Sequence, residues 1–400
     1  MHMDNIHPLL DEKRQTLARR YDKENRLLGL AGSALSLAFL VAFSETGLSA
    51  RLAHLWSGGP VVWPFLAYTA GFLAWLTILS LPLSFYRGYV HEHKWNFSTQ
   101  PVKGWLSDQA KSFAVLLVMA WLVLALLLWI MARFPGTWWL IAGLAMAFVS
   151  VIMATLFPVV ILPIFHRYTP IEDKELTNAL KEILAREGLK SGGFFQEDMS
   201  RRTRKENAFL AGLGKTRRVV LGDNLVKQMT LPEIVSIIGH EVGHYRHRHI
   251  CKGVVLETLE QLTVFFLLNV VMRAAFPGFP GSAREVLTVL PVMLIIAGTA
   301  SSLVFGPVGN SLSRHFEKQA DLYAAAYVKD THAFAAALAG LANRNLSNAY
   351  PTWWIKLFYY THPPVGERLQ YLEDESPTAL QKKCGSDIIK ADGRQPGYFL

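Results

Sequence analysis

Cysteine and charge are scarce in this sequence. Its 400 residues include only two cysteines, Cys251 and Cys384, and only 18% charged residues. Two distant cysteines indicate neither a disulfide framework nor a cysteine-based metal or redox motif. The shortage of charge, against 51% hydrophobic residues, is unusual for a soluble protein of this length and favours an integral membrane protein.

We do not expect the N-terminal residues to be the short basic leader of a secreted protein. Residues 1–26 mix acidic and basic side chains over a long polar stretch, so we expect the apolar run that follows to be retained as a membrane span. The net charge of +9 does not indicate nucleic-acid binding, because Lys and Arg accumulate in the cytoplasmic loops of membrane proteins. We therefore expect a lipid bilayer, and no nucleic acid, among the partners.

Apolar runs with few or no charges predict six membrane spans. Each run is about 17 residues or longer, near the length that crosses a hydrocarbon core of ~30 Å at ~1.5 Å per residue. The runs lie at about 27–43, 61–86, 113–132, 136–165, 254–272 and 286–308.

Basic residues alternate between the segments that connect these runs. The N-terminal segment, 87–112 and 166–250 are rich in Lys and Arg, whereas 44–60 holds only Arg51 and the connection after the third run holds only Arg133. The positive-inside rule therefore places the N-terminus, both basic segments and the C-terminus in the cytoplasm.

The basic segment 166–250 has the pattern of a folded domain. Residues 172–188 carry four apolar residues at helical spacing, Leu176, Leu180, Ile183 and Leu184. Residues 206–223 are typical of two short strands around a glycine-rich turn at 212–214. We expect the segment to contain both helices and strands.

A capped helix leads into the histidine-rich stretch IIGHEVGHYRHRH at 237–249. Thr230, Pro232 and Glu233 have the spacing of a capping box with a proline in the first turn. This start signal predicts a helix that continues through His244.

His240, Glu241 and His244 form an HExxH motif on that helix. The two histidines lie one turn apart on one face, so both imidazoles can reach one ion. Glu241 is rotated by ~100° from His240, so it borders the ion without easily binding it. That is the position of a general base that takes a proton from a water molecule activated by the metal.

The other two histidines of the stretch are weaker candidates for metal ligands. On a continuous helix His249 turns to the face opposite His240, nine residues earlier. His247 returns to the same face, but ~10.5 Å along the axis and beyond His244. Three ligands in a row on one straight helix cannot form a tetrahedral set. We therefore expect both to belong to a cationic helix end near the membrane interface.

A pair of acidic residues later in the chain can complete the site. In NSLSRHFEKQADLYAA, at 310–325, Glu317 and Asp321 are four residues apart and share a helical face. Glu317 can be the third ligand and leave the fourth position open for water, while Asp321 can accept the free N–H of a ligating histidine. Two predicted spans separate His244 from Glu317, so both lie on one side of the membrane.

These two motifs resemble the integral-membrane CAAX prenyl protease 1 family of zinc metallopeptidases. The segments LPLSFYRGYVHEHKWNFSTQ, LPIFHRYTPIEDKEL, ENAFLAGLGKTRRVVLGDNL and THPPVGERL are similar in the same order, from roughly residue 80 to 372. The resemblance implies seven spans around an intramembrane chamber, whereas the apolar runs predict six. It also implies one Zn²⁺ ion held by His240, His244 and Glu317, with Glu241 as the catalytic base.

The resemblance extends to residues outside the metal motifs. It implies that His362, in THPP, helps to stabilise the oxyanion and that Asn207 lies on the substrate side of the site. Arg368, in ERL, would orient nearby carboxylates in the substrate-binding region. We expect RRVVL, at 217–221, to be an edge strand of the kind that pairs with the substrate backbone in zincin-like proteases. This would place Asn207 and residues 208–212, with Ala208 and Phe209 among them, beside the scissile bond.

The sequence thus predicts a mainly α, polytopic helical membrane protein with six to seven spans around a chamber and a zincin-like α+β catalytic part on the cytoplasmic side. We expect four regions: 1–165 with about four spans, a catalytic part at 166–250, two further spans at 251–309, and 310–400 with the third ligand and a C-terminal tail.

The predicted function is that of a membrane-embedded zinc endopeptidase cleaving near the C-terminus of membrane-associated, isoprenylated CAAX-type peptides. One alternative is a broad quality-control metalloprotease of the heat-shock type. Another is a non-catalytic membrane protein with a structural metal site, which would need four protein ligands where only three are found. The oligomeric state is not predicted.

Overall fold

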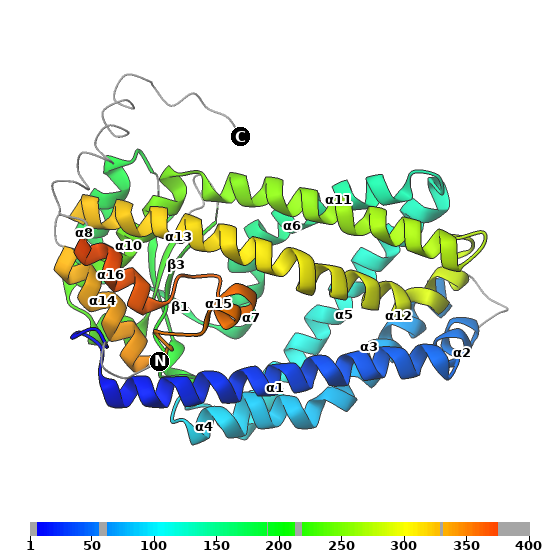
Figure 1. Cartoon of the computed structure of the whole chain (residues 1–400), viewed down its shortest axis with the longest axis horizontal. Helices are drawn as coiled ribbons and strands as arrows, with labels where there is room; N and C mark the ends of the chain where they lie inside the picture. Colours follow the sequence, from blue (N-terminus) through cyan, green and yellow to red (C-terminus); the bar gives the residue numbers. More distant parts are fainter. Residues whose placement is uncertain (1–5, 56–61, 190, 213–217, 329–330, 375–400) are drawn as a thin grey trace. The chain divides into compact units, whose positions relative to one another are not determined.

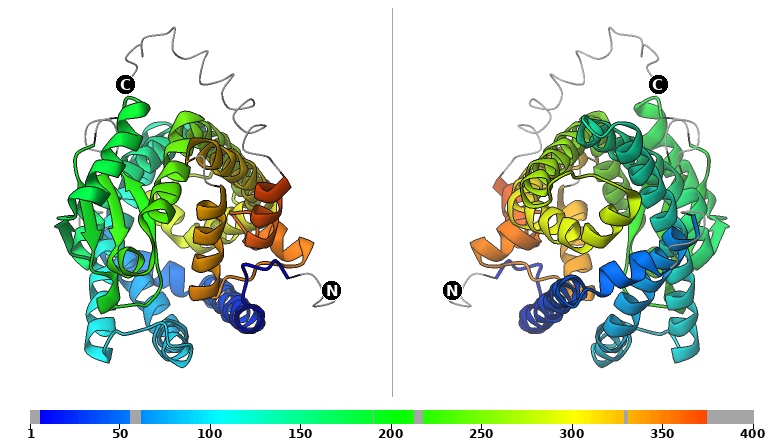
Figure 2. Two further views of the ribbon diagram at one scale, coloured as in Figure 1. Left: turned by 90° about the vertical axis from the view of Figure 1, so that its left-hand side faces the viewer. Right: turned by 90° about the vertical axis from the view of Figure 1, so that its right-hand side faces the viewer.

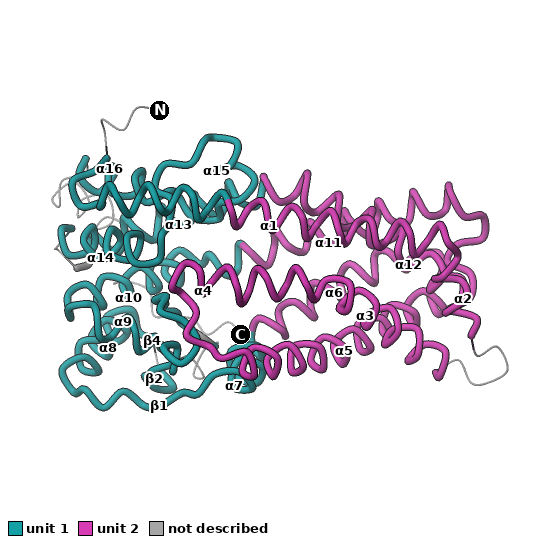
Figure 3. The backbone as a smooth tube through the Cα atoms, turned by 90° about the horizontal axis from the view of Figure 1, so that it is seen from below, with its two compact units in different colours: residues 1–23, 155–252, 308–400 teal, residues 24–154, 253–307 magenta. Residues whose placement is uncertain are grey.

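The computed structural model describes residues 6–55, 62–189, 191–212, 218–328 and 331–374. Helices dominate it, and one small sheet accompanies them (Figure 1). The chain divides into two compact units, residues 1–23, 155–252 and 308–400 in unit 1, and residues 24–154 and 253–307 in unit 2 (Figure 3).

Six helical stretches of the described chain are long and apolar enough to cross a membrane, which confirms the six predicted spans. They are α1 (Glu12–Glu45); α3 (Val62–Phe85) with η1 (Tyr86–His91) and α4 (Glu92–Lys94); α5 (Val102–Arg133); α6 (Trp138–Leu156) with η2 (Phe157–Ile161) and α7 (Leu162–Phe165); α11 (His249–Ala275); and α12 (Ala283–Ala300) with η5 (Ser301–Phe305) and α13 (Gly306–Val328).

Unit 2 consists of spans and the short helix α2 (Leu48–His54). Its interior includes the fully buried Trp138, whose indole N–H donates to Asn269 Oδ1 at 2.9 Å. Large apolar side chains also cover its outside, as at Ile78 and Phe148, which are 65% and 66% exposed. Exposed apolar side chains in such numbers are expected where lipid, and not water, is the solvent.

Unit 1 contains a four-stranded sheet in the order β1-β2-β4-β3 (Figure 2). Its strands are β1 (Tyr168–Pro170), β2 (Phe194–Glu197), β3 (Ala208–Ala211) and β4 (Arg218–Gly222). β2 and β4 run parallel, and the other two pairs are antiparallel. The two strands predicted within 206–223 are confirmed as β3 and β4, although most of the predicted turn at 212–214 lies outside the described residues. β3 forms one edge of the sheet, whereas β4 pairs with a strand on each side. The prediction that RRVVL is an edge strand is therefore wrong, because most of this stretch lies in β4.

The predicted helix at 172–188 is α8 (Lys174–Arg186), and its four apolar residues are buried as expected. Asp173 caps it by accepting the backbone N–H groups of Glu175 and Leu176 at 2.9 and 3.1 Å. Short side chains of this kind satisfy the unpaired N–H groups at a helix start. Two short helices, η3 (Met199–Arg201) and α9 (Asp223–Gln228), connect the following strands and helices.

The HExxH helix is α10 (Leu231–Arg246), and it begins with the predicted capping box of Thr230 and Glu233. α10 packs against α8, β3 and α14 (Thr331–Arg344). The chain ends, within the described residues, with α15 (Trp353–Tyr359) and α16 (Val365–Asp374). α16 packs against α14, which in turn packs against the helix that carries the histidines.

Candidate active site

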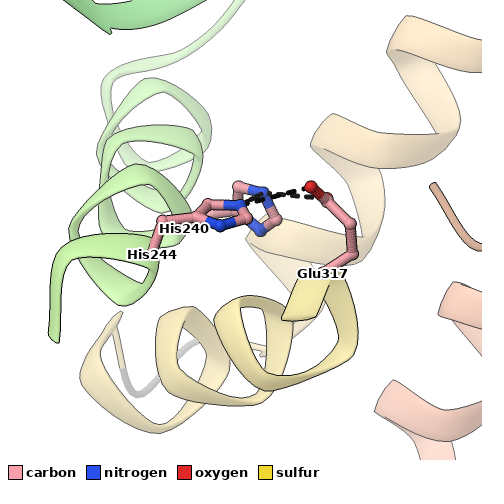
Figure 4. A group of neighbouring side chains, drawn as sticks. All are labelled: His240, His244 and Glu317. Atoms are coloured by element: carbon pink, nitrogen blue, oxygen red, sulfur yellow. Dashed lines mark hydrogen bonds and ion pairs between the residues drawn. The ribbon is translucent and has the colours of Figure 1, made fainter. Parts of the chain in front are cut away.

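Three side chains from two helices converge on one point (Figure 4). His240 and His244 project from α10, and Glu317 projects toward them from α13. The two histidine Nε2 atoms are 3.1 Å apart, and Glu317 oxygens lie 3.2 Å from His240 Nε2 and 3.3 Å from His244 Nε2. All three offer a ligand atom within 4.8 Å of one another.

The chemistry of these atoms fits a divalent metal ion. His240 Nδ1 lies 2.8 Å from Asp321 Oδ1, so it carries the proton and donates it, which leaves a lone pair on Nε2. That lone pair faces another imidazole nitrogen and a carboxylate. Electron-rich atoms at such distances repel one another unless a cation lies between them. Two nitrogens and one oxygen match a metal site that keeps one position open.

Asp321 is fully buried and contacts residues from two other helices. Besides His240, it accepts hydrogen bonds from Arg368, with 2.8 Å between Arg368 Nε and Asp321 Oδ2, and from the Tyr371 hydroxyl. Burial alone would lower the pKa of Arg368, but the charge of Asp321 outweighs it and raises that pKa above its ordinary value. Sequence reasoning found Asp321 and Arg368 but not Tyr371, which has no local pattern to mark it.

The same carboxylates act on His240. Burial would lower the pKa of its imidazole, but hydrogen bonds to Asp321 and Glu317 outweigh burial and raise that pKa to about 9. The two carboxylates therefore make the surroundings of the ring negative. This field equally favours a metal cation at the Nε2 position.

Glu241 lies beside the three convergent side chains without joining them. Burial raises the pKa of its carboxyl group, although the neighbouring histidines oppose that shift. A backbone hydrogen bond from Leu210, in β3, also opposes the shift and is the smallest of these effects. The edge strand therefore borders the side chain that sequence reasoning assigns as the base.

His362 reaches the site from the loop between α15 and α16. Its Nε2 lies 3.3 Å from Glu317 Oε1, while its side chain stays 60% exposed. Arg314 of α13 donates to the carbonyl oxygens of Lys356 and Tyr360 at 2.9 and 2.7 Å, and so fixes the end of α15 just before His362. Sequence reasoning missed Arg314, whose only signal was its place three residues before Glu317.

Asn207 is exposed and immediately precedes β3, where its carbonyl oxygen accepts the Gly222 N–H at 2.9 Å. Ala208 and Phe209 follow it in the strand. No contact between Asn207 and the convergent side chains is found in the described part of the chain. Its position depends on Glu206, which is buried and paired with Arg344 at the end of α14, a contact that sequence reasoning missed.

The expected position of His249 is wrong. α10 ends at Arg246, Arg248 adopts a left-handed backbone with φ of 54°, and a new helix begins at His249. His249 therefore does not lie on the face opposite His240, because its Nδ1 is 3.0 Å from His244 Nδ1. The ring of His247 stacks against the ring of His249, with centroids 5.5 Å apart.

Gly243 allows α10 and α13 to approach each other closely enough to form the site. A Cβ atom at this position would lie 2.9 Å from Ala320 Cα and 3.0 Å from Ala320 O. Both are backbone atoms, so the two helices would have to separate. Ala320 lies between Glu317 and Asp321, and any shift there moves both carboxylates.

We therefore expect Gly243→Ala to lower metal content and hydrolytic activity together, by at least tenfold in activity, since small displacements of catalytic groups are costly. Bound metal per chain and the rate of peptide hydrolysis would be measured on the purified protein. Gly253→Ala is the matched control, because a Cβ there meets nothing within 4 Å. Full metal occupancy in Gly243→Ala would contradict the close-packing explanation.

Comparisons with known proteins agree with this geometry. Peptidase family M48 matches residues 170–376, and the CAAX prenyl protease N-terminal family, described by five membrane helices, matches residues 4–167. Four of the six candidate spans fall within the described part of that N-terminal match.

Similar proteins match nearly the whole chain. An uncharacterized metalloprotease of Bacillus subtilis, YhfN, is 29% identical over 90% of this chain and 85% of its own. CAAX prenyl protease 1 of Saccharomyces cerevisiae is 29% identical over 91% and 86%. The crystal structure of S. mikatae Ste24p superposes with a TM-score of 0.81 at 26% identity, covering 91% of this chain and 89% of that one. The chain therefore belongs to peptidase family M48 and is a multi-pass membrane metalloprotease related to the CAAX prenyl proteases.

Proposed function

We propose that this protein is a zinc endopeptidase that cleaves near the C-terminus of membrane-associated, isoprenylated peptides. The observation that carries the proposal is the convergence of His240, His244 and Glu317, with Glu241 beside them. Three ligands leave one position open, as in catalytic zinc sites, whereas structural sites are closed by four protein ligands. A non-catalytic role would leave the neighbouring carboxylate of Glu241 without a purpose.

A zinc ion bound here would polarise the scissile carbonyl group and lower the pKa of a water molecule. Glu241 accepts a proton from the attacking water and passes it to the leaving amine. His362 donates a hydrogen bond to the developing oxyanion. Asp321 fixes the tautomer of His240, and Arg368 holds Asp321 in place.

β3 is the proposed docking edge for the peptide. Asn207 bonds through its backbone to Gly222 of the neighbouring strand, so the alternation of an antiparallel ladder turns the backbone N–H and C=O of Ala208 toward the open edge. An extended peptide can add to such an edge through main-chain hydrogen bonds. Asn207 and Phe209 then flank the bound peptide, close to Glu241.

A lipid on the substrate is supported by the relatives and by unit 2. Several of the similar proteins carry the name CAAX prenyl protease 1. Unit 2 contains a cavity of about 610 Å³ that α1, α3 and α12 line with both leucines and hydroxyl side chains, including Leu37, Leu83, Ser84 and Thr299. This volume lies within the usual range of ligand pockets, and its mixed lining suits an amphipathic molecule.

The active site is proposed to face the cytoplasm. The support is the alternation of basic and charge-poor connections along the chain, which follows the positive-inside rule.

Glu241→Gln tests the assignment of the base. The amide cannot accept a proton, so we expect peptide hydrolysis to fall by about 10²–10⁴-fold, while zinc content stays at that of the parent. Glu182→Gln, on the outside of α8, serves as the control and should be fully active. Unimpaired hydrolysis by Glu241→Gln would disprove the mechanism.

The substrate class is tested by comparing a farnesylated CAAX peptide with the same peptide lacking the lipid. Burial of the apolar chain should favour the farnesylated peptide by at least tenfold in kcat/KM, since each buried CH₂ contributes about 0.8 kcal/mol. Equal rates for the two peptides would favour the quality-control alternative.

Sidedness can be tested with the exposed native Cys251, which follows His249 by two residues in α11. In a Cys384→Ser background, a membrane-impermeant maleimide should label Cys251 only after cells are permeabilised. A cysteine introduced by Gly136→Cys, in the connection after α5, should be labelled in intact cells. The reverse pattern would place the site on the other side of the membrane.

A further inference from the structure

His249 is buried beside the metal site and has no role in the mechanism above. It is 6% exposed, with Nδ1 at 3.0 Å from His244 Nδ1 and Nε2 at 2.9 Å from Gln319 Oε1. Its ring stacks on Phe316, with centroids 4.5 Å apart and an interplanar angle of 14°. One residue of α10 and two of α13 therefore fix the ring.

A break between α10 and α11 makes this contact possible. On a continuous helix, five residues would rotate His249 by about 140° from His244. Instead, α10 ends at Arg246 and the left-handed backbone of Arg248 turns the chain before α11 begins. The turn brings His249, the first residue of α11, back against Nδ1 of His244.

The surrounding groups determine which nitrogen of each ring carries a proton. Gln319 Nε2 lies 3.2 Å from His315 Nε2, so the amide oxygen of Gln319 faces His249. That oxygen can only accept, so the Nε2–H of His249 donates to it. In a neutral ring the Nδ1 of His249 then accepts the Nδ1–H of His244. Nε2 of His244 keeps its lone pair, 3.3 Å from Glu317 Oε1.

We propose that His249 is a positioning residue that holds His244 in the tautomer and ring orientation needed to bind the metal, and that Gln319 fixes His249 in turn. The inference rests on the proposed function only in taking His244 as a ligand. Residues that accept the second N–H of a ligating histidine typically contribute 10–100-fold in metal affinity or activity. Asp321 does this for His240 as an anion, and His249 does it for His244 as a neutral ring.

The difference in charge between Asp321 and His249 affects the metal site. A second buried carboxylate would neutralise more of the charge of the metal ion, whereas an imidazole acceptor fixes His244 without adding negative charge. A zinc ion held by these residues would then polarise a carbonyl group more strongly. Asp321 and His249 therefore each accept the second N–H of a histidine ligand, but only Asp321 adds a negative charge.

The test uses the full-length, zinc-loaded protein in detergent. His249→Phe keeps the ring stacked on Phe316 but removes the acceptor, and His249→Asn returns an amide oxygen near the position of Nδ1. His247→Phe is the matched control, because it makes the same ring change in the neighbouring histidine. The rate of zinc release to a chelator, the unfolding temperature, and the visible spectrum of the Co²⁺-substituted protein would be measured for each.

We expect His249→Phe to release zinc about 10–100-fold faster than the parent and to change the Co²⁺ spectrum. His249→Asn should recover most of the loss, and His247→Phe should match the parent. Parent-like release from His249→Phe would overturn the proposal. So would a His249→Asn variant that folds normally but releases zinc as fast as His249→Phe.

If His249→Phe does not fold, Gln319→Leu answers the same question, because it keeps the ring of His249 but removes its orienting oxygen. Faster zinc release supports the inference, and unchanged release contradicts it. None of these measurements requires turnover. A protein that holds zinc as expected but cleaves no peptide would therefore refute the proposed function and leave the role of His249 intact.

Discussion

The buried charge of Asp321 is the constraint on which the catalytic part depends. Removing a carboxylate from water costs several kcal/mol unless partners compensate for it. His240, Arg368 and Tyr371 compensate from α10 and α16, so one charge on α13 joins three helices. The same contacts turn His240 toward Glu317. The packing of the helices and the orientation of the metal site therefore depend on the same contacts.

The parts of the structure that the sequence predicted have local signals. Membrane spans follow from the length of apolar runs, α8 and α10 from periodicity and capping, and β3 and β4 from short apolar runs around a glycine-rich turn. The convergence of His240, His244 and Glu317 was likewise predictable. Helical spacing places the two histidines together. An even number of predicted spans between His244 and Glu317 puts the carboxylate on the same side of the membrane. The resemblance to a known family added His362 and Arg368.

The rest depends on contacts between residues far apart in the chain. Tyr371, Arg314 and Glu206 are single polar residues without periodic neighbours, and only the folded chain shows that they fix Asp321, the end of α15 and the start of β3. The position of His249 was predicted wrongly for a related reason. Arg248 is not a residue type that usually adopts a positive φ, so nothing local marks the break after α10.

The hydrogen bond from Leu210 to Glu241 has a consequence for substrate length. Ladder alternation turns the backbone of Leu210, like that of Ala208, toward the open edge of β3. A peptide that adds to this edge would find the N–H of Leu210 already engaged by the base. Under the proposed function, main-chain pairing with β3 would therefore end at Leu210, beside the base.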